Sequence, residues 1–303
     1  MRILVTGGAG FIGSNLARRF ENENHEVVVL DDFSSGHWSN LKDFRGDVLT
    51  ADLASGLHLL ESRRPFDVIF HQASITDTTV ADQRRMMESN VETFRGLLGL
   101  AAAWGSRVIW ASSCSIYGQG QVPMKESQKP DPLNVYAFSK LTMERLAERY
   151  QPRLSQPIVG LRYSNVYGRG EARKGSFASM IYQLAKQMRS GSRPRIFYDG
   201  QQRRDFVYVD DVVQANLKAM IAKTGGVFNV GYGEAFSFNQ VVEQLNRVLK
   251  TDLPPDYFAN PYSFTQDWTQ TDLTEARRVL AYAPAYDLQR GIEAYHKSGH
   301  LGT

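Results

Sequence analysis

The sequence predicts an α/β fold built on a doubly wound parallel sheet. Two observations support this prediction. Short runs rich in β-branched residues alternate with longer helical patterns through the first half of the chain, and a glycine-rich turn follows the first run. Strands that alternate with helices imply right-handed crossovers and a parallel sheet covered on both faces. At 303 residues the chain is long enough for one large or two modest domains.

The expected elements follow one another in chain order. Buried strands are predicted at residues 2–6, 26–30, 47–51, 67–73 and 107–113, and helices at 11–22, 82–104 and 136–150. Beyond residues 157–168 the loops lengthen, and helices are predicted at about 176–189, 210–222 and 236–250. We therefore expect a first domain over residues 1–167 and a smaller lobe over 168–303, of which the segment near 205–222 returns to the first domain.

Composition and charge argue against several classes of function. The apolar fraction of 42% is that of a globular protein, and a net charge of +3 argues against nucleic acid as the partner. No apolar run approaches the ~18 residues of a membrane helix, and the first residues reach glycine too soon for a signal peptide. The single cysteine, Cys114, fits a reducing compartment, so a cytoplasmic protein is expected. The scattered histidines predict no metal site.

A glycine pattern, VTGGAGFIG, lies between the first predicted strand and the first predicted helix. Gly7, Gly10 and Gly13 are spaced three apart, with Phe11 and Ile12 in the same turn. Such glycines allow a tight turn, a close approach of the backbone to a pyrophosphate, and close packing of the helix on the strand. The amino terminus of the helix then faces the anion. The turn therefore predicts a dinucleotide site.

Two carboxylates follow the second predicted strand. Asp31, with Asp32 beside it, is placed where a carboxylate accepts hydrogen bonds from the ribose 2′-hydroxyl of NAD. A 2′-phosphate would be repelled, and the following segment, DFSSGHW, contains no lysine or arginine to offset that charge. We expect NAD as the cofactor, with NADP as the alternative because Lys42 or Arg45 could fold back.

Three further positions are candidates for the cofactor site. Asp52 and Leu53, after the third predicted strand, could contact adenine or belong to an ordinary loop, and the two interpretations weigh equally. Asn90 interrupts an apolar helical pattern. It is expected to hold a neighbouring loop near the cofactor, and the alternative is a plain polar residue of the helix.

The segment YAFSK places Tyr136 and Lys140 four residues apart, hence on one face of a helix. A tyrosine that acts as a base at neutral pH needs its pKa lowered from about 10, a shift worth ~4 kcal/mol. An adjacent ammonium and a positive nicotinamide ring both favour the phenolate. Ser113, at the end of the fifth predicted strand, could hydrogen-bond the substrate oxygen whose proton the tyrosine takes.

Together these motifs resemble the extended short-chain dehydrogenase/reductases of the NAD-dependent sugar-nucleotide epimerase and dehydratase group. The resemblance covers essentially the whole chain through TGGAGFIGSN, VIFHQAS, ASSCSIYG, YAFSK, LRYSNVYG and RDFVYVDDV. It implies a Rossmann domain that binds NAD or NADP, a lobe that binds a nucleoside diphosphate sugar, and a cofactor reduced and reoxidised within one turnover. It further implies a catalytic trio of Ser113, Tyr136 and Lys140, and cofactor contacts from Gln72, Ala73 and Ser74.

Within this group the loop GEARKGSFAS is most similar to that of the ADP-glycero-manno-heptose 6-epimerases. The resemblance implies that Lys174 is a second acid/base, which delivers a proton on the face opposite Tyr136. It also implies substrate contacts at Asn165 and Ser176, and a diphosphate contact at Arg204. Gln183 stands where that family carries a histidine, and the segment near Tyr262 is longer than in the family, so both bear on which sugar is bound.

Alternatives remain at this point. Lys174 could be solvated or could bind the diphosphate, and Arg204 could be a surface charge. A UDP-hexose 4-epimerase shares the trio without needing the lysine, whereas a 4,6-dehydratase is disfavoured because no carboxylate follows Ser113. A non-catalytic dinucleotide-binding scaffold and a reductase that releases its cofactor are further possibilities. On resemblance, a homo-oligomer formed through helices 82–104 and 136–150 is expected.

Overall fold

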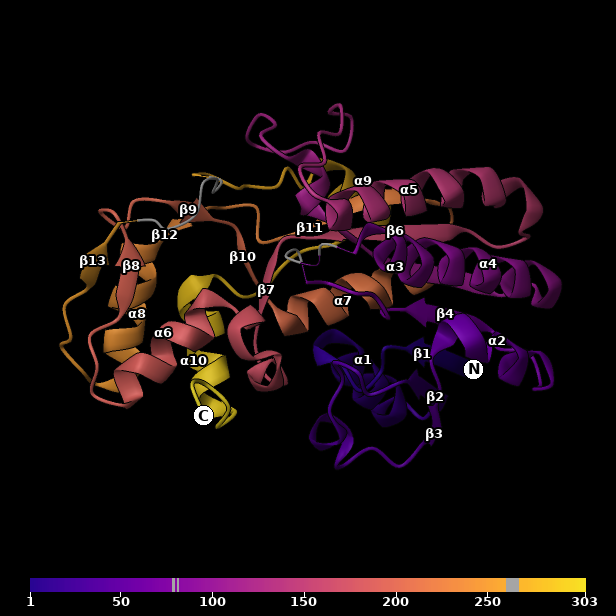
Figure 1. The fold of residues 1–303 in the computed structure, drawn as a ribbon, viewed down its shortest axis with the longest axis horizontal. Helices are drawn as coiled ribbons and strands as arrows, with labels where there is room; N and C mark the ends of the chain where they lie inside the picture. The colour runs from indigo at the N-terminus through magenta and orange to yellow at the C-terminus, as the bar shows by residue number, and fades with distance from the viewer. Residues whose placement is uncertain (78–79, 81, 260–266) are drawn as a thin grey trace.

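The computed structural model describes residues 1–77, 80, 82–259 and 267–303, and its main feature is a parallel sheet. Seven strands of the described chain pair in the order β11-β6-β5-β4-β1-β2-β3 (Figure 1). All six pairings are parallel. The strands are β1 Arg2–Thr6, β2 Glu26–Asp31, β3 Asp47–Thr50, β4 Val68–His71, β5 Arg107–Ser113, β6 Ile158–Tyr163 and β11 Gly226–Val230. The predicted parallel sheet and its first five strands are confirmed.

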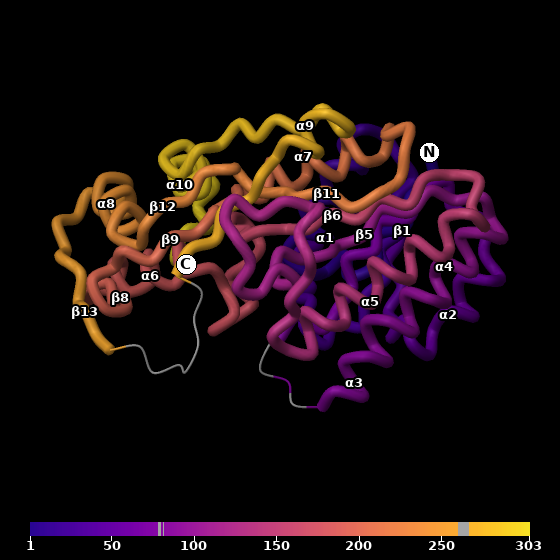
Figure 2. The backbone as a smooth tube through the Cα atoms, turned by 90° about the horizontal axis from the view of Figure 1, so that it is seen from above, coloured from indigo at the N-terminus to yellow at the C-terminus, as the bar shows by residue number. Residues whose placement is uncertain are grey.

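Helices cover both faces of this sheet. One face packs against α1 Phe11–Asn22, α7 Val209–Met220 and α9 Thr274–Leu280, through a core that includes Ile3 and Val5 of β1. The other face packs against α2 Leu53–Glu61, α4 Thr93–Trp104 and α5 Val135–Tyr150, through a core that includes Leu4. Alternate residues of β1 thus serve opposite cores, as the two-residue period of a strand requires. Figure 2 shows α7 and α9 on one side of the strands and α4 and α5 on the other.

The remaining elements form a smaller lobe beside the carboxyl ends of the strands (Figure 1). It contains α6 Met180–Arg189, α8 Phe238–Leu249 and α10 Leu288–Lys297, and three short strand pairs. The pairs join β7 Asn165–Tyr167 to β10 Phe206–Tyr208, β8 Arg195–Phe197 to β13 Asp256–Phe258, and β9 Arg203–Arg204 to β12 Phe236–Ser237. Its core is separate from both sheet cores. The chain beyond residue 167 therefore contributes to both parts of the structure: α7, β11 and α9 pack with the large sheet, and the other elements form the lobe.

Two helical segments differ from the prediction. Helix α2 was not predicted, although its buried Leu53 and Leu60 pack under the sheet. The segment predicted as one helix over 82–104 consists of α3 Gln83–Met87, a π-helical turn over Glu88–Glu92, and α4. Asn90 lies in this π turn, and its side chain bonds outside the helix. Extra residues of this kind are common near functional sites, because they redirect a side chain.

Candidate active site

In the turn between β1 and α1, the glycine backbone lies very close to neighbouring backbone atoms. Gly7 has φ +66°, and a Cβ there would lie 2.6 Å from the backbone nitrogen of Ala73, which follows β4. A Cβ on Gly13 would lie 2.2 Å from the carbonyl oxygen of Gly7. Only glycine fits these positions, as the pattern predicted. The described residues provide no side-chain cap for α1, so its first amides are available to an anion.

A second observation supports a dinucleotide at this turn. The side-chain nitrogen of Gln72, directly after β4, is buried and has no hydrogen-bond partner among the described residues. The backbone amide of Gln72 bonds to the carbonyl of Thr6, which places Gln72, Ala73 and Ser74 beside the glycine turn. An unpaired buried amide donor is costly, so a polar ligand at this position is favoured. The residues present therefore fit the dinucleotide that the sequence predicted.

Asp31 ends β2 beside the same turn and is buried. One of its carboxylate oxygens accepts the amide of Ala9, and the other accepts the amide of Phe33, each at 2.8 Å. Burial raises the pKa of Asp31, and these amide bonds oppose the rise. A carboxylate oxygen has more than one acceptor site, so the bonds leave capacity for a ribose hydroxyl. Asp32 is exposed and bonds to Ser34 instead.

Asp52 and Leu53 have structural roles that the sequence left undecided. Oδ1 of Asp52 accepts the amide of Ala54 at 2.9 Å and caps helix α2, while Leu53 is buried in the core beneath the sheet. A capping aspartate stabilises a helix by about 1 kcal/mol. These contacts give both residues a structural role, and the predicted adenine contact stays a prediction.

Asn90 holds the loop that follows β4. Its Oδ1 accepts the amide of Ile75 at 2.8 Å, and its Nδ2 donates to the carbonyl of Ile75 at 3.1 Å. The same Nδ2 lies 3.0 Å from Oγ of Ser139 on α5. Asn90 thus fixes this loop relative to the helix that carries the predicted tyrosine and lysine.

The predicted catalytic trio meets at the carboxyl end of β5. Asn134 caps α5 through the amide of Ala137, so Tyr136 lies in the first turn of the helix. Ser113 lies near the phenol of Tyr136 and favours its ionised form by lowering its pKa. Lys140 is only 1% exposed, its Nζ lies 5.8 Å from the centre of the Tyr136 ring, and it donates to the carbonyl of Ala111 at 2.8 Å.

Burial dominates the electrostatics of this trio. It lowers the pKa of Lys140 to about 7 and raises the pKa of Tyr136, a rise that Ser113 opposes. The lysine alone therefore does not produce the low tyrosine pKa that a base at neutral pH needs. The positive nicotinamide ring of a bound cofactor is the other charge that favours the phenolate.

A buried ion pair behind the trio was not predicted. Glu144, one turn beyond Lys140 on α5, accepts a hydrogen bond from Ser112 at 2.6 Å and forms a salt bridge of 2.7 Å with Arg162 of β6. Both side chains of the ion pair are almost fully buried. The sequence does carry a signal for Glu144: it follows Lys140 by four residues, as Lys140 follows Tyr136, so all three lie on one face of the helix. The pair fixes α5 against β5 and β6, and hence fixes the trio.

Lys174 lies in a 3₁₀ segment over Ala172–Phe177. Its Nζ is 5.7 Å from the centre of the Phe11 ring, at the start of α1. Burial lowers the pKa of Lys174, and the nearby carboxylate of Glu171 opposes this change. The amine therefore packs against the residue that follows the glycine turn, and it is partly shielded from solvent.

The loop that carries Lys174 is tied to the glycine turn. Nδ2 of Asn40 donates to the carbonyl of Ala9 in the turn at 3.0 Å and to the carbonyl of Gly170 in the loop at 3.3 Å. Asn15 on α1 makes a similar bridge between the carbonyls of Phe11 and Arg169. The turn and the loop thus form one hydrogen-bonded unit.

The predicted substrate residues occupy the lobe side of the site. Nδ2 of Asn165 lies 3.2 Å from Oγ1 of Thr269, and Ser176 is exposed. Nε2 of Gln183 donates to the carbonyls of Ser176 and Ala178, so this glutamine supports the Lys174 loop. Tyr262 lies outside the described residues.

Arg204 is a largely desolvated cation. It donates to the carbonyl of Arg203 at 2.8 Å, and its guanidinium lies 5.7 Å from the centre of the Phe238 ring. Burial lowers the pKa of Arg204, and the more distant Asp267 opposes this. Within the described part of the chain no carboxylate forms an ion pair with it. A desolvated guanidinium of this kind suits an anionic ligand.

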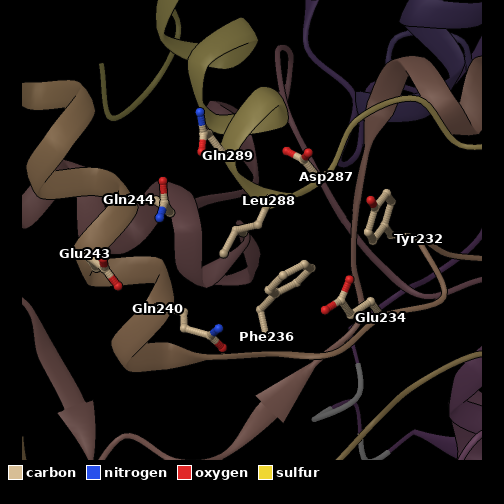
Figure 3. Close-up of a pocket in the computed structure, with 9 residues that line it drawn as sticks. All are labelled: Tyr232, Glu234, Phe236, Gln240, Glu243, Gln244, Asp287, Leu288 and Gln289. Atoms are coloured by element: carbon tan, nitrogen blue, oxygen red, sulfur yellow. The ribbon is translucent and has the colours of Figure 1, made fainter.

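Two surface pockets lie in the lobe. Figure 3 shows the first, of about 320 Å³, between α8 and α10. None of the predicted site residues lines it, so it is not the active site. The second, of about 670 Å³, is lined by Tyr198, Asp199, Gln201, Gln202, Arg203, Asp267 and Trp268. Its two aromatic rings are about half exposed, at 56% for Tyr198 and 47% for Trp268.

The described residues contain no group of three or more side chains that could hold a metal ion. In the same part of the chain, every helix is too short or too polar to cross a membrane.

Comparisons with known proteins agree with this geometry. Residues 3–231 match the NAD dependent epimerase/dehydratase family. The ADP-L-glycero-D-manno-heptose-6-epimerase of Brachyspira hyodysenteriae is 34% identical, over 97% of this chain and 96% of that protein. The crystal structure of the enzyme of that name from Helicobacter pylori has 42% identity and a TM-score of 0.93, covering 99% of this chain and 96% of its own. UDP-glucose 4-epimerase from Thermotoga maritima has 30% identity and a TM-score of 0.90, covering 99% of each chain.

Proposed function

Since the chain belongs to the NAD dependent epimerase/dehydratase family, we propose that it is an NAD-dependent epimerase that inverts C6 of an ADP-glycero-manno-heptose. The curated relatives and a 42% identical structure carry the name of that activity. The UDP-hexose 4-epimerases are the alternative, because a structure of one is 30% identical to this chain.

The proposal is supported mainly by the positions of Tyr136 and Lys174. Tyr136 and Lys174 approach the same edge of the sheet from different elements, α5 at the end of β5 and the loop beside the glycine turn at the end of β1. Strand β4 lies between β1 and β5, so the two strand ends are roughly 10 Å apart. A sugar held between them would face a proton acceptor on one side and a proton donor on the other.

This arrangement suits epimerisation through a ketone. Bound NAD supplies a hydride acceptor for the sugar carbon and afterwards a donor. Tyr136, with Ser113 orienting the sugar hydroxyl, takes the hydroxyl proton as the carbinol becomes a ketone. After the ketone turns over, the new oxygen points away from Tyr136. Lys174 then gives it a proton as the opposite face is reduced, and solvent restores both groups.

The nucleotide part of the substrate would lie in the lobe. The desolvated guanidinium of Arg204 supports a contact with the diphosphate. The second pocket presents Tyr198 and Trp268, and exposed aromatic faces are suited to stacking on a nucleobase. Arg203 lies 5.4 Å from the centre of the Trp268 ring and adds positive charge to the same pocket. These contacts support a nucleoside diphosphate sugar, and the resemblance selects ADP.

Two further expectations, a homo-oligomer and a cytoplasmic location, belong to the same proposal. Phe138 of α5 is 44% exposed, and the neighbouring Leu133 is 47% exposed. We expect this face of α5 to pair with a second copy of the chain in a homo-oligomer, because exposed aromatic residues are enriched at such interfaces. The single Cys114 is buried and unpaired, as suits a cytoplasmic protein.

The test is a substrate survey. The purified protein is incubated with ADP-, GDP-, CDP- and UDP-linked heptoses and hexoses, and the stereochemistry of the products is determined by NMR. Nucleotide released on denaturation is identified by chromatography. Inversion at C6 of ADP-heptose with NAD released supports the proposal. Inversion only at C4 of a UDP-hexose selects the alternative, and bound nucleotide without turnover indicates a scaffold.

A further inference from the structure

Glu171, in the loop that carries Lys174, has a fully buried side chain. It is 0% exposed, and its carboxylate accepts three hydrogen bonds. Oε1 accepts the amide of Gly168 at 2.9 Å and the hydroxyl of Ser179 at 3.0 Å, while Oε2 accepts the amide of Ser179 at 2.6 Å. One carboxylate therefore joins the start of the loop to its end, with Lys174 midway between.

The donors around Glu171 favour an ionised carboxylate. All three partners donate, and a carboxylate offers only acceptors, whereas a glutamine amide would direct N–H groups at one of these donors. Burial raises the pKa of Glu171, and the hydrogen bonds and Lys174 oppose the rise. The other titratable groups that face it are the phenols of Tyr167, Tyr182 and Tyr295 on β7, α6 and α10. Of these groups, Lys174 is the one that carries charge at neutral pH.

The remaining contacts of the loop leave Lys174 dependent on this carboxylate. The amide of Lys174 donates to the carbonyl of Glu171 at 2.9 Å. Directly after Lys174, Gly175 has φ +57° with nothing within 4 Å of its Cβ position, and the following Ser176 and Phe177 are exposed. Asn15 and Asn40 hold only the stretch before Glu171, at Arg169 and Gly170. Gln183 holds the second half of the loop at the carbonyls of Ser176 and Ala178, and Glu171 joins the two halves on either side of Lys174.

We propose that Glu171 is a positioning residue that sets the Lys174 amine for proton transfer to the substrate, an inference that rests on the proposed function. Its carboxylate acts in two ways. It fixes the backbone on both sides of the lysine, and its charge keeps the amine protonated in a partly desolvated site.

The test compares four proteins: wild type, Glu171→Gln, Lys174→Met, and the double variant. Glu293→Gln is the matched control, because it makes the same change in an exposed ion pair of the same lobe. Epimerisation is followed by NMR. The half-reaction, oxidation of the sugar by bound NAD, is followed by the absorbance of reduced nicotinamide in a single turnover.

Glu171→Gln is expected to slow epimerisation by about a hundredfold, the usual effect of misplacing a catalytic group by about an ångström. The half-reaction should stay within about twofold of wild type, because Tyr136 carries it. The limb of the pH profile that reports Lys174 should move to lower pH, because losing a negative neighbour lowers the lysine pKa. In the Lys174→Met background the second change should add less than about twofold, because coupled residues are not additive.

Three results would overturn the inference: an unchanged epimerisation rate, equal losses in epimerisation and half-reaction, or full additivity with Lys174→Met. If Glu171→Gln does not retain its cofactor, Glu171→Asp replaces it. That variant keeps the charge, so a lower rate with an unmoved pH limb supports the inference, and a wild-type rate overturns it. Failure of the proposed function is distinguishable, because Lys174→Met alone would then epimerise normally.

Discussion

Asn15 and Arg169, which are 154 residues apart in the chain, form a reciprocal pair of hydrogen bonds. Nδ2 of Asn15 donates to the carbonyl of Arg169 at 2.9 Å, and Nε of Arg169 donates to Oδ1 of Asn15 at 2.8 Å. The pair joins α1, which follows the glycine turn, to the loop that carries Lys174. The glycine turn and the loop that carries Lys174 are therefore held by one set of contacts.

Replacing Asn15 by alanine should disturb both sides of this unit. The change removes the bond from Nε of Arg169, which keeps its ion pair with Asp210, and leaves the carbonyl of Arg169 without its side-chain donor. The free energy of unfolding should therefore fall by about 1–3 kcal/mol. Epimerisation should fall more than the half-reaction does. Urea denaturation and the two rate assays check this. Arg84→Ala, in an exposed ion pair on α3, is the control and should change stability by less than about 1 kcal/mol. A stable Asn15→Ala protein with normal epimerisation would refute the coupling.

Replacing Tyr136 by phenylalanine should abolish both epimerisation and the half-reaction while NAD stays bound. The reason is that only the phenol oxygen is removed, and with it the proton acceptor that lies near Ser113. Chromatography of released nucleotide and single-turnover absorbance measure the two properties. Turnover within about tenfold of wild type would exclude the tyrosine as the base.

The buried amine of Lys140 predicts how stability depends on pH. Burial lowers its pKa from the ordinary lysine value of 10.5 to about 7 in the folded protein, so the unfolded chain binds more protons between these limits. The free energy of unfolding of the cofactor-free protein should therefore rise from pH 7 to pH 9. Lys140→Met should flatten this rise. Chemical denaturation at several pH values checks it, and an equal slope in both proteins would contradict the assignment.

Replacing Trp268 by alanine should weaken binding of the nucleotide without affecting the chemistry. Stacking on an aromatic ring contributes roughly 1–3 kcal/mol per base, so KM should rise about five- to a hundredfold while kcat stays within about threefold. Tyr257→Ala is the control, since Tyr257 is similarly exposed at 50% but lies outside this pocket. Unchanged KM in the Trp268 variant would place the base elsewhere.

Local chemistry explains which parts of the site the sequence predicted. The glycine turn and the Tyr136 and Lys140 pair depend on neighbours within a few residues, so their spacing predicted the tight turn and the shared helix. Glu144 and Glu171 were missed because their partners come from other parts of the fold: Arg162 and Ser112 for the first, and the two ends of a loop for the second.

Asp52 and helix α2 are a second case in which the local sequence pattern was not sufficient. A carboxylate after a strand fits an adenine contact or an ordinary loop, and the cap on the Ala54 amide depends on helix α2, which was not predicted. The π turn at Asn90 also escaped prediction, because apolar periodicity over 82–104 is nearly the same with and without one extra residue.

The central claim is that two groups, on opposite sides of the sugar, handle the protons. The most direct measurement is a single turnover of Lys174→Met with ADP-heptose, observing reduced nicotinamide by absorbance and the C6 configuration by NMR. The account predicts reduction of the cofactor at close to the wild-type rate, while the inverted epimer forms at least about a hundredfold more slowly. Formation of the inverted epimer at the wild-type rate would contradict it.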